Sequence, residues 1–168
     1  MPFGAEGSKV IPYQRMRLLA AEEFAMPTAA LTPRVRMMVI CDHVRESRSE
    51  VGVFDLKGVR QRATVDVVPF TTDRLSLFFL LSSPRAGEFP GYVRVVSDRT
   101  DRVVYYSYLR PRPEFADGGG TCTGRVALRC IFPEEGQYTV QLWFFQHEGA
   151  DVLKGEIPFQ VLKHEAST

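Results

Sequence analysis

The chain has 168 residues, of which 45% are hydrophobic and 24% are charged. That is enough chain to bury one hydrophobic core, and this composition is not that of a mainly disordered protein. Lys and Arg number 21 and Asp and Glu number 20, so the net charge is +1. Proteins dedicated to nucleic acids or to anionic membranes need a surplus of positive charge, so we expect neither kind of partner.

Compartment signals are few. Residues 1–10 lack the apolar run of a secretory signal, and the longest apolar run, 75–81, is too short to cross a bilayer as a helix. The three cysteines, Cys41, Cys122 and Cys130, are an odd number at irregular spacing, unlike a secreted disulfide scaffold. We therefore expect reduced thiols and a cytoplasmic location. The preference for Arg over Lys is associated with GC-rich bacterial genomes, which favours a bacterial origin.

Residues 1–33 form a predicted N-terminal arm that contains no strand-like run. Pro12 and Pro27 bracket the segment 13–25, where a helix can begin and must stop. One helical face of that segment, with its neighbouring position, gathers apolar side chains: Tyr13, Met16, Leu19, Ala20 and Phe24. The pattern predicts a short helix at 13–25 that needs packing to persist, or a loosely attached arm.

From residue 34 the pattern changes to short β-type runs separated by turn residues at intervals of about ten residues. The predicted strands span 34–42, 51–59, 62–70, 74–82, 91–97, 102–109, 124–132, 137–146 and 152–162. No helical crossover interrupts them. We therefore predict an all-β fold, an Ig-like antiparallel β-sandwich of about seven to nine strands over 34–162, followed by a polar tail at 163–168.

Period-two alternation predicts which side chains face the core. The predicted core comprises Val126, Leu128, Phe132, Tyr138, Val140, Leu142, Ile157 and Phe159. Pro158 places its strand at an edge or a bulge. The same alternation sends Trp143, Phe145 and Phe78 to the outer faces of their strands unless a bulge returns them to the core.

The segment 132–140 reads as strand, corner and strand, with Tyr138 just inside the second strand. It resembles the tyrosine corner of Ig-like sandwiches, where the tyrosine hydroxyl bonds to upstream backbone. Together with the Cys-Asp-His-Val run at 41–44, the layout resembles a family of uncharacterised bacterial proteins with an Ig-like sandwich. The resemblance covers about 34–162 and implies a fold, with no activity.

We find no catalytic constellation in the sequence. Cys41 and His43 lie two residues apart and would make a thiol–imidazole pair, but no oxyanion device or activating helix end accompanies them. No cysteine or histidine has the spacing of a zinc site. The glycine-rich run at 117–120 lacks the phosphate-binding form and is expected to be a hairpin connection. We expect no metal and no cofactor.

Two groups of residues are candidates for binding. Tyr106 and Tyr108 share one face of a strand, and Arg110 continues the same parity, which suggests a ligand-stacking platform. Trp143 and Phe145 form a predicted outward patch. Its predicted cover is the arm, through Tyr13, Met16 and Phe24, either within one chain or exchanged in a homodimer.

The sequence favours a non-enzymatic structural or protein–protein interaction module, which either binds a protein partner or self-associates. A small-ligand or carbohydrate-binding sandwich is one alternative, and a thiol-dependent hydrolase at Cys41 is another. A concave pocket lined by Tyr106 and Tyr108 would favour the ligand-binding alternative, and a flat apolar patch would favour an interaction module.

Overall fold

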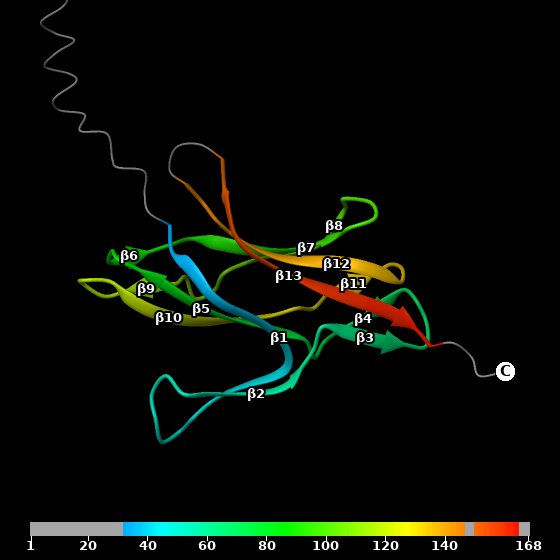
Figure 1. Ribbon diagram of the computed structural model, residues 1–168, viewed down its shortest axis with the longest axis horizontal. Coiled ribbons are helices and arrows are strands. Elements are labelled where there is room, and N and C mark those ends of the chain that lie inside the picture. The colour runs from blue at the N-terminus through cyan, green and yellow to red at the C-terminus, as the bar shows by residue number, and fades with distance from the viewer. Residues whose placement is uncertain (1–31, 147–149, 165–168) are drawn as a thin grey trace, which may run out of the picture. The chain divides into compact units, whose positions relative to one another are not determined.

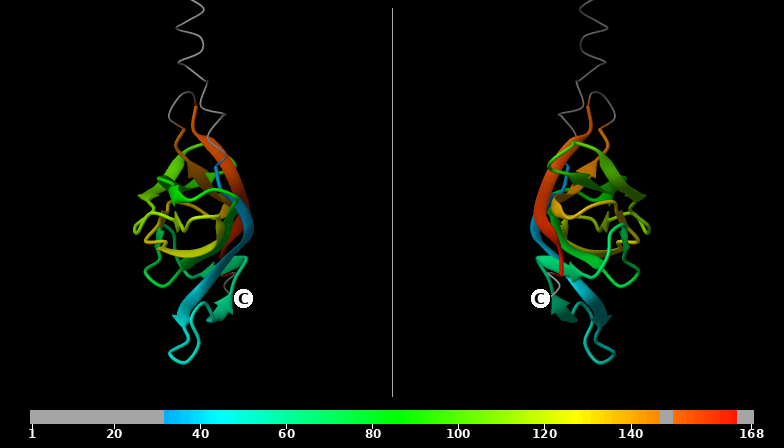
Figure 2. Two further views of the ribbon diagram at one scale, coloured as in Figure 1. Left: turned by 90° about the vertical axis from the view of Figure 1, so that its left-hand side faces the viewer. Right: turned by 90° about the vertical axis from the view of Figure 1, so that its right-hand side faces the viewer.

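A four-stranded sheet and a five-stranded sheet face each other across a shared core in the computed structural model, which describes residues 32–146 and 150–164 (Figures 1 and 2). The described residues contain no helix, so none crosses a membrane as a helix. The all-β sandwich predicted from the alternation is confirmed. The predicted helix at 13–25 lies outside the described residues.

The four-stranded sheet has the order β10-β5-β1-β2. Its strands are β10 (Gly120–Ala127), β5 (Ser76–Ser83), β1 (Arg34–Glu46) and β2 (Phe54–Val59). All of its pairs are antiparallel.

The five-stranded sheet has the order β3-β13-β12-β7-β8. Its strands are β3 (Arg62–Val65), β13 (Val152–Lys163), β12 (Gly136–Phe144), β7 (Gly91–Ser97) and β8 (Val103–Tyr108). Its pairs are antiparallel except β13 with β3, which run parallel. Two short ladders complete the fold, β4 (Phe70–Thr71) with β11 (Ile131–Phe132) and β6 (Gly87–Glu88) with β9 (Glu114–Phe115).

The core lies between the two sheets and follows the predicted alternation. Of the predicted core residues, Ile157 is half-buried against the core, and the others are buried: Val126, Leu128, Phe132, Tyr138, Val140, Leu142 and Phe159. Leu128 directly follows β10 and Phe132 lies on β11, and the other positions lie on β10, β12 and β13. The alternation along these segments therefore predicts which side chains face the core.

The prediction of an edge or a bulge at Pro158 holds only locally, because β13 is an inner strand of its sheet but has one unpaired side at Pro158. Pro158 faces Thr139 of β12, but the pairing of β13 with β3 begins only at Gln160. A proline nitrogen cannot donate to a ladder, so it is tolerated where β13 has a neighbour on one side only.

Phe78 points away from the main core, as the alternation predicts, yet it is buried. The hairpin of β1 and β2 covers it: Phe78 packs with Cys41, Val44 and Phe54 in a second, smaller cluster. The Phe54 and Phe78 rings lie 5.1 Å apart. On the neighbouring strand β10, Gly124 pairs with Phe79 of β5. A Cβ at Gly124 would lie 2.3 Å from the Phe79 ring, so this position requires glycine.

Candidate interaction surface

Five aromatic side chains gather on the outer face of the five-stranded sheet. We call them the aromatic surface: Tyr92, Tyr106, Tyr108, Trp143 and Phe145. The register brings them together, because Tyr92 of β7 lies between Tyr108 of β8 and Trp143 of β12. The neighbours Leu142 and Phe144 are buried in the core, so alternation directs Trp143 outward.

A bulge lies beside Trp143 but does not return it to the core. The register of β12 with β13 passes from Leu142–Gly155 to Trp143–Leu153, so the extra residue, Lys154, belongs to β13. The alternation of β12 therefore continues through Trp143.

The rings of the aromatic surface pack on one another around Tyr92. Its ring is parallel to that of Trp143, at 2° and 6.1 Å, and lies 4.8 Å from that of Tyr106. Phe145 contacts Tyr92 at 5.2 Å and Tyr108 at 6.1 Å. Tyr106 and Tyr108 meet edge to face, at 89° and 5.2 Å. Each of these separations is typical of favourable aromatic pairs.

Polar groups fix the position of two of these rings. The guanidinium of Arg94 lies 4.4 Å from the centre of the Trp143 ring, within cation–π distance. Arg94 Nε and Trp143 Nε1 both donate to Gln141 Oε1, at 2.7 and 3.1 Å. Tyr92 donates its hydroxyl to Asp151 Oδ2 at 3.1 Å. The base of the surface is therefore rigid and has satisfied polar atoms.

Exposure divides the aromatic surface into a base and a free part. Tyr92 is 7% exposed, whereas Tyr106 and Tyr108 are 45% and 54% exposed. Partial burial and a hydrogen bond with Tyr108 raise the pKa of Tyr106 to about 12. The free part offers apolar ring faces together with hydroxyl groups, the combination that is enriched at protein interfaces.

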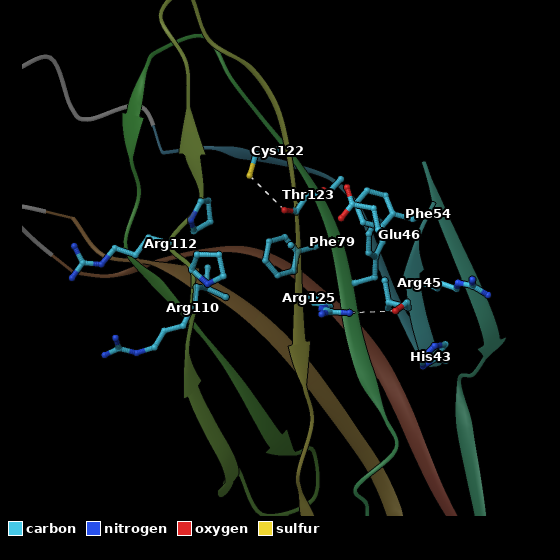
Figure 3. Close-up of a pocket in the computed structure, with 16 residues that line it drawn as sticks. His43, Arg45, Glu46, Phe54, Phe79, Arg110, Arg112, Cys122, Thr123 and Arg125 are labelled. Atoms are coloured by element: carbon cyan, nitrogen blue, oxygen red, sulfur yellow. Dashed lines mark hydrogen bonds between the residues drawn. The ribbon is translucent and has the colours of Figure 1, made fainter. Parts of the chain in front are cut away.

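A groove of about 750 Å³ lies near the end of β8, where the segment 109–113 faces β10. Figure 3 shows Arg110 and Arg112 on one side of β10 and Arg45 and His43 on the other. Its charged lining is mostly cationic, with Glu46 as its carboxylate. Arg125 Nη1 donates to the carbonyl of Val44 at 3.3 Å. Neither Tyr106 nor Tyr108 lines this groove.

The cysteines are free thiols in three different environments. Cys41 is completely buried, its Sγ lies 3.8 Å from the carbonyl of Ser76, and burial raises the pKa of its thiol. His43, two residues along the chain, is exposed at the surface. This environment disfavours the thiolate that a nucleophilic cysteine requires.

The two groups of candidate binding residues predicted from the sequence lie together in the structure. Tyr106, Tyr108, Trp143 and Phe145 form one surface. Arg110 departs from them, because β8 ends at Tyr108 and Arg110 lines the groove instead. The predicted arm residues Tyr13, Met16 and Phe24 lie outside the described residues.

Sequence reasoning missed Tyr92 and Arg94. They lie on the strand predicted at 91–97, which the structure places at Gly91–Ser97. Their alternation with the buried Val93 and Val95 was the signal that places them outward.

Comparisons with known proteins add little to this description. No protein-family model matches the chain, and no curated protein matches it. Among solved structures, the soluble domain of PmoD from Methylocystis sp. ATCC 49242 (Rockwell) is similar over 76% of this chain and 96% of that domain. The identity is 9% and the TM-score is 0.32. At these values the likeness carries no inference about function.

Proposed function

We propose that the chain is a non-enzymatic β-sandwich module that binds a protein partner through the aromatic surface. The observation that carries this proposal is the exposure of Tyr106 and Tyr108 beside the ordered base of Tyr92 and Trp143. Binding energy at protein interfaces is concentrated in Tyr, Trp and Arg side chains that are held in place before binding. The aromatic surface supplies the tyrosines and the tryptophan, and Arg94 beside it supplies the arginine.

The ring geometry supports a protein partner over a carbohydrate. Sugars stack on flat, open ring faces, but the two exposed rings, Tyr106 and Tyr108, stand perpendicular to each other. The parallel pair is Tyr92 with Trp143, and Tyr92 is buried. The surface therefore offers an uneven apolar relief rather than a row of coplanar rings. A module that binds a polysaccharide is the alternative, and the experiments below distinguish it from a module that binds a protein.

The remaining parts of the proposal rest on the sequence and on one local hydrogen bond. The tyrosine corner at Tyr138 supports the Ig-like assignment, because its hydroxyl bonds to the carbonyl of Glu134. The odd number of free cysteines and the residue usage support a bacterial, cytoplasmic protein. Self-association through the predicted arm is a further proposal.

A photo-crosslinking amino acid at position 108 tests the main proposal. We expect one discrete protein adduct at Tyr108 and none at the control position Val59, which lies on the other sheet and is 63% exposed. The crosslinked protein, once purified, should bind the unmodified chain and lose at least tenfold in affinity with Tyr108→Ala, about 1.4 kcal/mol. Equal crosslinking at both positions would contradict the proposal.

Retardation in gels that contain soluble polysaccharides tests the alternative. Retardation that disappears with Tyr108→Ala, in the absence of a protein adduct, would replace the protein partner with a carbohydrate.

A further inference from the structure

β8 is a sheet edge whose outward backbone groups belong to the two exposed tyrosines. The carbonyl of Tyr108 also accepts a hydrogen bond from the hydroxyl of Ser107 at 3.3 Å. In an antiparallel pair, alternate residues direct their N–H and C=O groups toward the partner strand. The N–H of Leu109 donates to the carbonyl of Gly91 in β7. The backbone N–H and C=O groups of Leu109, and of Ser107 two residues earlier, therefore point toward β7. Tyr106 and Tyr108 therefore direct their backbone N–H and C=O groups to the outside of the sheet.

This edge lacks the features with which sheet proteins usually block strand addition. Natural edges carry charged residues, proline or bulges that disturb the edge. β8 contains no charged residue and no proline, and its irregularity lies near its start, where Val95 pairs with Tyr105 and Val96 with Val103. From Tyr105 to Tyr108 the pairing with β7 is regular, and no described strand pairs with the other side of β8.

We propose, building on the function above, that the partner contributes an extended segment that pairs with the edge of β8. Its main chain would bond to the outward N–H and C=O groups of Tyr106 and Tyr108. Side chains opposite these residues lie on the same face of the sheet, so they would pack on the aromatic surface. Apolar residues at alternate positions of the segment fit that face.

Arginines that follow the end of β8 favour an acidic residue at one end of the partner segment. Arg110 makes no ion pair with any described residue, and Arg112 lies 3.5 Å from Glu88. The groove that begins there is lined by two further arginines, Arg45 and Arg125. An acidic residue in the segment, placed just beyond Tyr108, would meet these arginines. The partner is thus an extended, apolar segment with an acidic end.

A second copy of this chain fits the edge poorly. Arg102 directly precedes β8, and Arg110 and Arg112 follow it. An antiparallel pair of two β8 strands would therefore bring the arginine at the start of one strand toward the arginines that follow the other. Like charges directly opposite each other destabilise a pair of strands. The edge therefore favours a segment whose charges oppose its own.

The test uses a displayed library of random twelve-residue peptides, selected on the whole chain. We expect enriched peptides to alternate apolar residues and to carry Asp or Glu at one end. Two variants separate the backbone from the side chain. Tyr106→Ala removes the ring, whereas Tyr106→Pro removes the ring and an N–H that is not bonded to β7, a position where an edge strand tolerates proline. We expect about tenfold weaker binding with Ala and about tenfold weaker again with Pro.

Amide hydrogen exchange provides a readout that does not depend on the variants. On addition of a selected peptide, the amides of Tyr106 and Tyr108 should become protected, whereas that of Ser107, already bonded to β7, should change little. N-methylation of alternate peptide residues should abolish binding, and methylation of the residues between them should not.

The possible outcomes distinguish this inference from the function on which it rests. Equal weakening by Ala and Pro, without protection of the two amides, would refute strand pairing and leave the aromatic surface as the binding site. Protection of these amides in the free, monomeric chain would mean that the edge is already occupied, and would overturn the inference. Enrichment of basic peptides would contradict the acidic end of the partner segment. Unchanged peptide affinity in both Tyr106→Ala and Tyr106→Pro would overturn the whole inference.

Discussion

The hydroxyl of Tyr138 donates a 2.8 Å hydrogen bond to the backbone carbonyl of Glu134, four residues upstream. The ring itself is fully buried and meets Phe132 edge to face at 4.8 Å. One side chain thus joins the corner before β12 to the core of the sandwich. Such a contact stabilises both the turn and the position of the strand that carries Trp143.

Replacing Tyr138 with Phe should lower the free energy of unfolding by about 1–3 kcal/mol, because it leaves the Glu134 carbonyl without its partner. Urea unfolding would measure the loss. Tyr105→Phe is the matched control, since its hydroxyl also donates to a carbonyl, that of Ala127 at 2.7 Å, but on a less buried side chain. If Tyr138→Phe costs no more than Tyr105→Phe, the corner is not a special point of stability.

Leu142 tests the phase of β12. It is completely buried between the sheets, so Leu142→Ala should cost about 2–5 kcal/mol of unfolding free energy. Leu153→Ala, in the neighbouring strand at 37% exposure, should cost clearly less. Thermal unfolding of the two variants would compare them, and equal melting temperatures would contradict the assigned phase.

Much of the fold could be predicted because period-two alternation is a local signal. The strand carrying Val140 and Leu142 has apolar residues on one face and mostly polar ones on the other, so the face that meets the core was readable from the sequence. The parallel pairing of β3 with β13 was not readable, because it joins segments far apart in the chain and no local pattern records it. The burial of Phe78 was missed for the same reason: its cover is a hairpin, and only the pairing of β1 with β2 brings Phe54 over it.

The candidate site shows the same division. Alternation placed Tyr106 and Tyr108 on one face and Trp143 on an outer face. That β7 brings these strands side by side, with Tyr92 between them, depends on strand order, which alternation cannot give. Arg110 was misplaced because parity was carried past Tyr108, where β8 ends.

Arg94 should protect Trp143 from water. Its guanidinium covers one face of the indole at 4.4 Å, so Arg94→Ala should shift the fluorescence emission of Trp143 to longer wavelength. The chain has a single tryptophan, so the signal reports this site alone. Arg99→Ala is the control, because Arg99 pairs with Glu134 just before the start of β12, whereas Trp143 lies near the end of that strand. An unchanged emission maximum in Arg94→Ala would show that the arginine does not shield the ring.

The thiols should differ in reactivity in the folded protein. Cys122 is half-buried, whereas Cys41 and Cys130 are buried and burial raises the pKa of both. A thiol reagent at about neutral pH should therefore label Cys122 first, because the reactive species is an accessible thiolate. Without reductant, all three should react after unfolding in urea. Recovery of one thiol only would mean that a disulfide had formed, and would weaken the cytoplasmic assignment.

Cys130 should also make stability depend on pH in the alkaline range. Burial raises the pKa of its thiol from 9.0 to about 12, so the folded chain keeps a proton that the unfolded chain releases. The contribution is complete below about pH 9 and is lost as the pH rises toward 12. Urea unfolding with reductant at about pH 8 and about pH 10.5 should show lower stability at the higher pH.

The variant Cys130→Ala is the control. It should be less stable than the parent chain at both pH values, because it leaves a cavity, but its stability should fall less between them. A part of the loss should persist in that variant, since burial also raises the pKa of Tyr138. An equal loss in the variant and the parent chain would show that the Cys130 thiol does not set this dependence.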